Sequence, residues 1–168
     1  MISKEAYIEW TPTRLADPRS AKVEQFIHGL EQIIATEGPV MASRVFQTFS
    51  KAGGLNRIYG ETKKSFLHAL RTALDNGAFV AEQEASEDPT TWILRLPSQM
   101  HVRIRTLGSR TLHEVPGAEL AEFMLEFRVE NELISREELF RKVLDEYGLS
   151  RLTEATSNRL DFVLSTWF

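Results

Sequence analysis

Three consecutive segments with the spacing of amphipathic helices constrain the fold of this chain more than any other feature. Apolar residues recur three and four positions apart from Val23 to Ile34, from Val45 to Phe49 and from Phe66 to Leu74, as on the buried face of an α-helix. Helix-ending signals follow at Gly38-Pro39, Gly53-Gly54 and Asn76-Gly77. The sequence therefore predicts a bundle of three short helices from residue 21 onward.

Two short strands are expected directly after the third helix. Residues 78–81 and 91–96 are rich in β-prone side chains, and the polar loop 82–89 between them contains a turn signal. Three helices followed by a two-stranded hairpin is the order of a winged helix-turn-helix, whose third helix would be the recognition element. Residues 101–105 alternate in polarity and are a candidate for a third strand.

The second half of the sequence repeats features of the first. Laying Gly54-Leu-Asn-Arg57 on Gly148-Leu-Ser-Arg151 without a gap also places Phe46 on Phe140 and Phe66 on Leu160, which favours a structural repeat. We therefore expect a mainly α fold with a small β-wing, made of tandem winged-helix-like units. The predicted parts are an extended N-terminal arm or linker at residues 1–20, a winged helix-turn-helix unit at 21–110, and a second, reduced three-helix unit at 111–168.

The composition excludes several classes of protein. The 168 residues contain no cysteine, which rules out disulfide scaffolds, thiol nucleophiles, iron–sulfur clusters and cysteine-ligated zinc. No apolar run approaches the roughly 18 residues of a membrane span, and the first residues lack the apolar region of a signal peptide. We therefore expect a cytoplasmic protein with no membrane partner. The net charge of -4 excludes a strongly basic nucleic-acid binder, so any such role requires a local patch.

A basic patch is present from Ser43 to Thr72. This window contains six basic residues and a single acidic one, Glu61. It covers the second helix, the turn and the third helix, the parts that face the duplex in helix-turn-helix proteins. The candidate nucleic-acid-binding residues are Ser43, Arg44, Arg57, Lys63, Lys64 and Arg71. The alternative is an ordinary solvated basic face that is balanced by acidic surface elsewhere.

Charged residues outside the window from Ser43 to Thr72 limit where DNA is expected to bind. The expected hairpin tip carries Glu82, Glu84, Glu87 and Asp88, which would repel a phosphate backbone. Arg103, Arg105 and Arg110 either extend the basic strip or pair with these carboxylates. The second half is mainly acidic and suits packing on the first unit or contact with a protein partner. Its aromatic end belongs to a core or, if exposed, marks an interface.

The sequence offers no constellation for catalysis. The four histidines, His28, His68, His101 and His113, lie on separate elements and form no metal-ligand spacing. There is no Gly-x-Ser-x-Gly elbow and no phosphate-binding Gly-x-x-x-x-Gly-Lys-Ser/Thr loop. We therefore predict a chain that is not itself an enzyme, with no catalytic residues, no metal site and no cofactor.

Several motifs together resemble a known family. They are, along the chain, Tyr7-x-x-Trp10-Thr-Pro12, Leu15-Ala-Asp-Pro-Arg-Ser20, Glu37-Gly-Pro-Val40, Arg44-Val-Phe46, Arg95-Leu-Pro97, Val102-Arg-x-Arg105 and Glu114-Val-Pro116. In combination they resemble the uncharacterised C-terminal domain of large bacterial proteins related to superfamily 1 DNA helicases, where it follows a helicase core and a restriction-endonuclease-like domain. The likeness covers most of the chain and is strongest from Tyr7 to Glu119. It implies an accessory module whose partners are the helicase and nuclease domains of a larger parent chain.

These observations predict a non-catalytic DNA-binding accessory domain that contacts phosphates through the second helix, the turn and the third helix. The alternative is a protein–protein interaction or dimerisation module built from tandem winged helices, with a homodimer as a possible form. A third interpretation is a structural end-cap that packs on upstream domains. Exposure of Trp10 in the isolated chain would favour the third.

Overall fold

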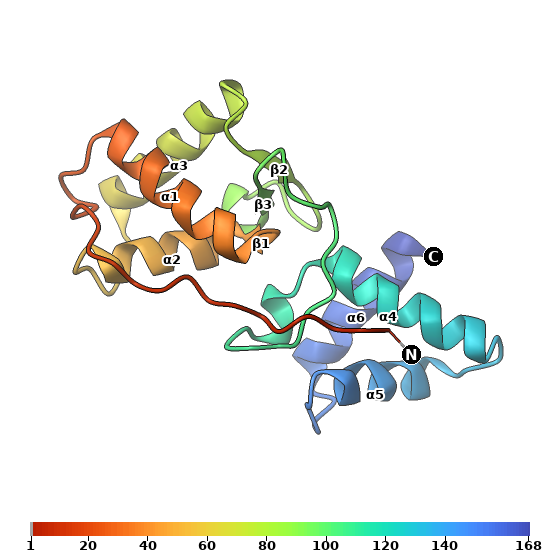
Figure 1. The fold of residues 1–168 in the computed structure, drawn as a ribbon. Helices are drawn as coiled ribbons and strands as arrows, with labels where there is room; N and C mark the ends of the chain where they lie inside the picture. The colour runs from red at the N-terminus through yellow and green to blue at the C-terminus, as the bar shows by residue number, and fades with distance from the viewer. Residues whose placement is uncertain (1) are drawn as a thin grey trace. The chain divides into compact units, whose positions relative to one another are not determined.

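The computed structural model describes residues 2–168, which form two compact units (Figure 1). The first unit comprises residues 8–101, and the second unit comprises residues 2–7 together with residues 102–168. Within the described residues the chain is mainly helical, with six α-helices and one small antiparallel sheet. None of these helices has both the length and the apolar character needed to cross a bilayer.

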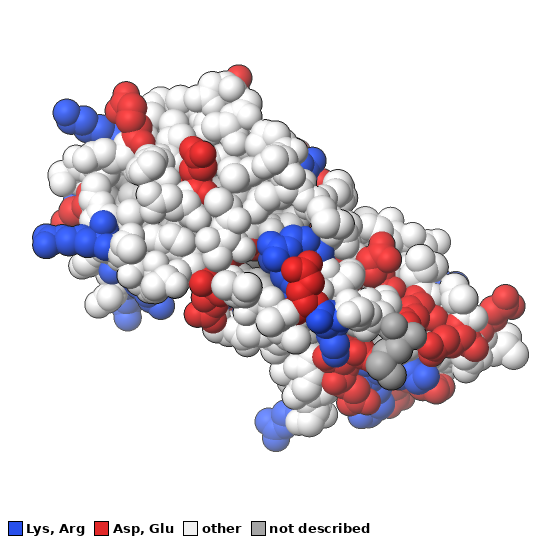
Figure 2. Space-filling model, viewed as in Figure 1, with Lys and Arg blue, Asp and Glu red and all other residues white. Residues whose placement is uncertain are grey.

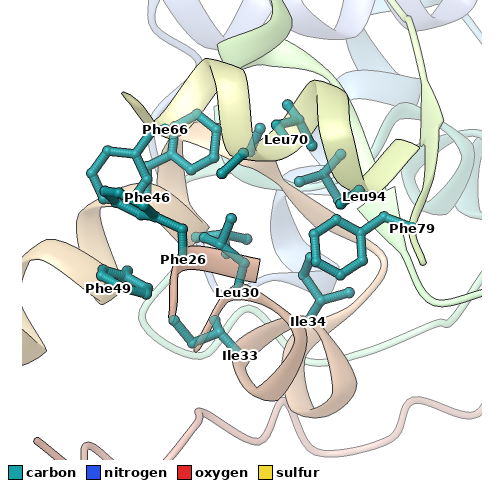
Figure 3. Packing of buried hydrophobic residues seen from close by; sticks show 14 of the residues in the cluster. Phe26, Leu30, Ile33, Ile34, Phe46, Phe49, Phe66, Leu70, Phe79 and Leu94 are labelled. Atoms are coloured by element: carbon teal, nitrogen blue, oxygen red, sulfur yellow. The ribbon is translucent and has the colours of Figure 1, made fainter. Parts of the chain in front are cut away.

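Three helices form the body of the first unit, as the apolar spacing predicts. They are α1 (Val23–Glu37), α2 (Ala42–Ala52) and α3 (Gly60–Asp75). Each contributes a phenylalanine to the centre of the core, where the Phe66 ring lies 4.8 Å from that of Phe26 and 5.4 Å from that of Phe49, between centroids (Figure 3). Edge-on and stacked ring pairs at these distances add to the free energy gained by burying the rings. This aromatic cluster fixes how the three helices pack within the unit.

A three-stranded sheet completes the first unit. Its strands are β1 (Val40–Met41), β2 (Val80–Glu82) and β3 (Ile93–Arg95), in the order β1-β3-β2. Val40 pairs with Leu94, and Val80 pairs with Arg95, both in antiparallel register. The hairpin is present as predicted, but β2 is shifted toward the loop from the expected residues 78–81, and β3 is shorter than the expected residues 91–96. The remaining strand, β1, comes between α1 and α2 in the chain. Residues 101–105, which the sequence suggested as a third strand, stay outside the sheet.

An extended segment docks on the first unit before α1. The Trp10 N–H donates to the Glu37 carboxylate over 3.1 Å, and the Leu15 N–H donates to the Ala52 carbonyl over 3.2 Å. Trp10 is only 8% exposed, so the exposed Trp10 that would favour an end-cap is not observed. A Cβ at Gly53 would lie 2.4 Å from the Ala16 carbonyl oxygen, so only glycine lets the segment approach the end of α2 this closely.

The second unit is built from three more helices. They are α4 (Gly117–Glu130), α5 (Arg136–Glu146) and α6 (Glu154–Trp167), preceded by a 3-10 turn at Leu112–Glu114. Phe123, Phe140 and Val163 are fully buried between them, and the Phe123 ring meets the Tyr147 ring edge-on at 5.4 Å. Arg159 of α6 donates to the Val115 carbonyl over 2.7 Å, which fastens α6 to the segment before α4. No strand of a sheet is present among the described residues of this unit.

Residues 2–7 belong to the second unit because they pair with the segment after residue 102. The Glu5 N–H donates to the Ile104 carbonyl, and the Thr106 N–H donates to the Glu5 carbonyl, each over 2.8 Å. Lys4 binds the Glu146 carboxylate over 2.7 Å. The resulting division, at residues 7 and 101, differs from the expected boundaries at residues 20 and 110.

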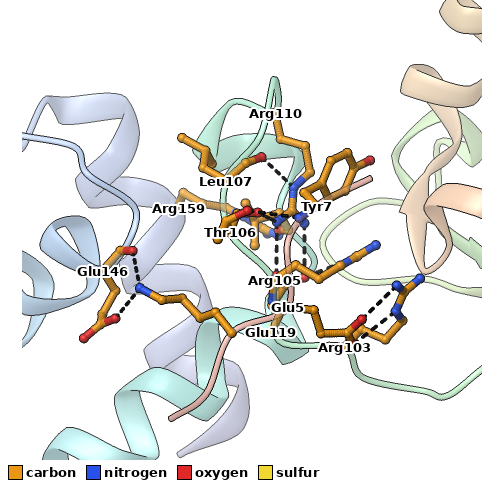
Figure 4. Close-up of polar contacts among 12 residues, drawn as sticks. Glu5, Tyr7, Arg103, Arg105, Thr106, Leu107, Arg110, Glu119, Glu146 and Arg159 are labelled. Carbon is orange, nitrogen blue, oxygen red and sulfur yellow. Dashed lines mark hydrogen bonds and ion pairs between the residues drawn. The ribbon is translucent and has the colours of Figure 1, made fainter. Parts of the chain in front are cut away.

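A buried charge cluster lies beneath this pairing (Figure 4). Glu119 accepts from Arg105 over 3.2 Å and from Arg110 over 3.1 Å, and the Glu119, Arg105 and Arg110 side chains are only 1% exposed. Both guanidinium groups lie over the Tyr7 ring, at 5.0 and 4.3 Å. Burial lowers the pKa of Arg105, and the nearby Glu119 carboxylate opposes that shift. Arg105 and Arg110 are therefore buried against Glu119 and do not extend a basic strip, and Arg103 pairs with Glu5.

The helices of the two units are spaced identically along the chain. Each helix of the second unit, α4, α5 or α6, starts a fixed number of residues after its counterpart α1, α2 or α3. This offset is the same as the one between Gly54 and Gly148. Both glycines have positive φ, 87° at Gly54 and 69° at Gly148. The first unit begins at Ile8, and the longer segment of the second unit begins at the matching position, Val102. The gap-free correspondence seen in the sequence therefore extends to the starts of all three helices, and the segment before α4 is the counterpart of the segment before α1.

Candidate nucleic-acid interface

The candidate residues lie on α2, on the turn that follows it, and on α3. Ser43 is exposed in the first turn of α2, and Lys51 is exposed in its last turn. Arg57 is exposed in the turn, and Lys63, Lys64 and Arg71 are exposed along α3. The apolar face of α3, with Phe66, Ala69 and Leu70, is buried, so the same helical spacing that forms the core directs the cations to solvent.

Arg44 differs from the other candidates because carboxylates surround it. Its Nε donates to Glu37 Oε1 over 2.9 Å, and its Nη2 lies 4.0 Å from Glu9 Oε1. The Arg44 side chain is 15% exposed and that of Glu37 is 2% exposed. A guanidinium that balances a buried carboxylate is not free to neutralise a phosphate as well. We therefore assign Arg44 to the structure of the first unit rather than to an interface.

The turn before α3 presents an aromatic ring beside a guanidinium. Tyr59 is 65% exposed, and Arg57 Nη1 donates to its hydroxyl oxygen over 3.2 Å. Gly60 follows with a φ of 46°, and no atom lies within 4 Å of where its Cβ would be. Tyr59 is not among the residues predicted from the sequence, where it is one of three apolar or aromatic residues in this turn, with Leu55 and Ile58. Of the three, Tyr59 is the exposed one.

The cations of α3 differ in their surroundings. Lys64 lies 3.2 Å from Glu61 in an exposed i,i+3 pair, a type of pair that contributes little and competes weakly with a phosphate. Lys63 lies close enough to the hairpin to help lower the pKa of Asp88, although the main causes of that lowering are the hydrogen bonds from the Thr90 N–H and hydroxyl. No ion pair is recorded for Arg71 among residues 2–168. Lys63, Lys64 and Arg71 are thus available to an anionic ligand.

The hairpin side of α3 is hollowed and mostly apolar. A groove of about 250 Å³ is lined by Leu67, Leu70, Leu74, Pro89 and Trp92, with Arg71 and Asp75 as its charged groups. The hairpin itself holds Glu82, whose carboxylate lies 2.6 Å from His101 Nε2. Neither the apolar lining nor the Glu82 carboxylate suits a phosphate, so the favourable region is limited to the exposed cations, from Lys51 at the end of α2 to Arg71 on α3.

The second unit has the same helices but, of the five exposed cations, keeps only the counterpart of Arg57, Arg151. At the positions that match Lys51, Lys63, Lys64 and Arg71 it carries Asp145, Ser157, Asn158 and Ser165. Acidic side chains gather over α4 and α5 on the face shown in Figure 2. The three-helix arrangement therefore forms without four of the cations, and their presence in the first unit is not explained by folding.

A metal centre is not found in the described part of the chain. There, no group of three or more His, Asp or Glu side chains is placed to hold a metal ion. His28 contacts Gln32 and His101 contacts Glu82, so these two histidines take part in separate surface contacts.

Comparison of the chain with known proteins gives no family or relative from which a function could be assigned. No family model, no curated protein and no solved structure matches the chain.

Proposed function

We propose that residues 8–101 form a winged helix that binds DNA without catalysis, as an accessory domain of a larger DNA-processing protein. The element order α1-β1-α2-α3-β2-β3 supports the winged-helix assignment, because a hairpin follows three helices and its second strand pairs with β1. By the sequence repeat, residues 102–168 are a reduced copy without the hairpin. The helicase and nuclease partners rest on the family resemblance described above.

The exposed cations of the first unit carry the proposal. Lys51, Arg57, Lys63, Lys64 and Arg71 all face solvent on one continuous stretch of chain, from the end of α2 to α3. Four of the five are replaced by neutral or acidic residues at the matching positions of the second unit, which folds into the same helices. Cations that the fold does not require, grouped in an acidic chain, favour an anionic partner.

Phosphate contacts provide most of the binding in this proposal. Lysine and arginine side chains neutralise backbone phosphates and release counterions, a contribution that does not depend on base sequence. The acidic hairpin and the apolar lining of the groove offer no phosphate contact, so the contact is confined to the exposed cations from Lys51 to Arg71. We therefore expect the domain to recognise the structure of DNA rather than its sequence.

The proposal is tested by replacing two lysines of α3 with the residues at the matching positions of α6. Lys63→Ser with Lys64→Asn installs in α3 the residues that α6 carries at these positions. The full chain with both changes should bind a duplex oligonucleotide at least tenfold more weakly in a mobility-shift assay, because two phosphate contacts are lost. Arg141→Ser with Arg151→Asn removes the same charge from exposed positions of the second unit and should leave binding unchanged. Equal affinity of the α3 variant and the wild type would show that DNA does not bind at this face.

A second candidate function, dimerisation, is favoured by an exposed apolar patch on the second unit. Val129 is 73% exposed and Leu133 is 93% exposed at the end of α4 and just beyond it. A groove of about 310 Å³ nearby is lined by Arg128, Glu132, Ile134, Leu164 and Phe168, among others. A patch with both signs of charge is suited to a second copy of itself, because a two-fold axis brings each arginine toward the other copy's glutamate.

Light scattering tests the second candidate. A dimer should form in the wild type and dissociate in the Leu133→Glu variant, because the added carboxylates would be desolvated at the centre of the contact. A wild-type chain that stays monomeric at high micromolar concentration excludes dimerisation.

A further inference from the structure

Tyr59 is an exposed aromatic residue at a position where the fold offers it no role. Its ring is 65% exposed, and it is the residue before α3. Among residues 2–168, its only side-chain hydrogen bond comes from Arg57, which is itself exposed. Burial in the core therefore does not explain an aromatic residue here.

The second unit shows which residue the fold favours at this position. Thr153 matches Tyr59, and its hydroxyl caps α6 by accepting from the Thr156 N–H over 3.2 Å. Tyr59 makes no side-chain cap for α3. A threonine N-cap stabilises a helix relative to a residue that cannot cap it. The first unit thus has a tyrosine where a threonine would stabilise it more, as is common where a residue serves binding.

The surroundings of Tyr59 suit a nucleotide whose base is unstacked. The aromatic face offers a stacking surface, and the neighbouring Arg57 and Lys63 are exposed cations that can meet the phosphates on either side of it. The ring is open to solvent over most of its surface, since Tyr59 is 65% exposed. A blunt duplex offers phosphates to these cations but presents no free base face along its length.

We infer that Tyr59 stacks on an unpaired base, so that the domain prefers DNA with a single-stranded segment over blunt duplex DNA. This inference rests on the proposed function and deepens it by naming the form of DNA that the turn recognises. Arg57 holds the ring by its hydrogen bond and, with Lys63, contacts the flanking phosphates. Stacking supplies the preference, and the cations supply affinity common to both forms.

Two probes and three variants of the full chain test the inference. The probes are a blunt duplex and the same duplex with an unpaired thymidine tail, each titrated by fluorescence anisotropy. The wild type should bind the tailed probe roughly tenfold more tightly, the effect of one stacked base. Tyr59→Thr should reduce this ratio to near one and raise the melting temperature by adding a cap, whereas Tyr59→Phe should keep the ratio. Trp167→Leu, which removes an exposed aromatic ring from the second unit, is the control and should leave the ratio unchanged.

The outcomes separate this inference from the proposed function. A wild-type ratio near one, or a ratio that Tyr59→Thr leaves unchanged, overturns the role of Tyr59. In either case the proposed function still stands if Lys63→Ser with Lys64→Asn weakens binding to both probes. If that variant binds both probes as well as the wild type does, the proposed function itself is wrong.

Discussion

Arg44 Nε lies 2.9 Å from Glu37 Oε1, which joins the start of α2 to the end of α1 across β1. The other oxygen of Glu37 accepts from the Trp10 N–H, so one buried carboxylate connects three segments of the first unit. A carboxylate removed from water in this way stabilises a fold only while its partners are present. This arrangement gives Glu37 and Arg44 structural roles.

Glu37→Ala is expected to destabilise the first unit by about 2–4 kcal/mol, because it leaves the Trp10 N–H and a largely buried guanidinium without their carboxylate. Urea denaturation followed by tryptophan fluorescence measures the loss. Glu31→Ala, on an exposed position of the same helix, is the control and should change the free energy of unfolding by less than about 0.5 kcal/mol. A similar stability for both variants would contradict the role assigned to Glu37.

Arg44→Gln should lower stability without a specific loss of DNA affinity. Its charge is already balanced by Glu37 and Glu9, so its removal takes no phosphate contact away. Duplex binding measured well below the melting temperature should stay within about twofold of the wild type. A tenfold loss of duplex affinity in the folded variant would show that Arg44 does contact DNA.

Glu119→Gln should destabilise the second unit by about 3–5 kcal/mol, because it leaves the buried Arg105 and Arg110 side chains without their counter-charge. Calorimetry of the full chain measures this change as a lower melting temperature for that unit. Glu122→Gln, one turn along α4 at an exposed position, provides the comparison and should melt like the wild type.

Asp17 should titrate well below an ordinary aspartate. Hydrogen bonds from the Arg19 side chain and then from its N–H lower the pKa of Asp17 from 3.8 to about 2. Because the folded pKa lies below the unfolded one, the contribution of this contact to stability is present above pH 3.8 and is lost as the pH falls toward 2. A carboxyl carbon titration by NMR measures the pKa. Arg19→Ala should raise it toward 3.8, and an unchanged value would show that Arg19 is not its cause.

The affinity for duplex DNA should fall steeply with salt. Each neutralised phosphate contributes about 0.9 to the slope of log K against log salt concentration, so three to five contacts give a slope of roughly -3 to -4.5. Lys63→Ser with Lys64→Asn should make the slope shallower by nearly two. A salt-independent affinity would indicate that the cations of α3 do not meet phosphates.

Helix positions were predictable because they depend on local spacing. The segments from Val23, Val45 and Phe66 contain the period of 3.6 residues, and their glycine stops are adjacent in the chain. The strand β1 was not predicted, because two residues are too few to show alternation. Its pairing with β3 depends on a distant partner, Leu94, that leaves no signal around Val40.

The charged contacts were less predictable than the helices. The sequence shows six basic residues from Ser43 to Thr72, but not that Arg44 turns toward Glu37 while Lys63 faces solvent. Similarly, the sequence alone suggests that Arg105 and Arg110 are surface cations, because Glu119 binds them only once the chain has folded. Which of two nearby cations is buried depends on long-range packing, so an account of the interface from sequence alone contains more residues than the structure leaves available.

The pairing of Glu5 with Ile104 and Thr106 has a consequence for synthesis on the ribosome. Residues 8–101 emerge complete before the later partners of Glu5 are translated, so the first unit can fold while residues 2–7 are still waiting. Residues 2–7 can join the second unit only after residues 104–106 have been translated. A pause or truncation after residue 101 would therefore leave one finished unit preceded by residues 2–7 without their pairing partners.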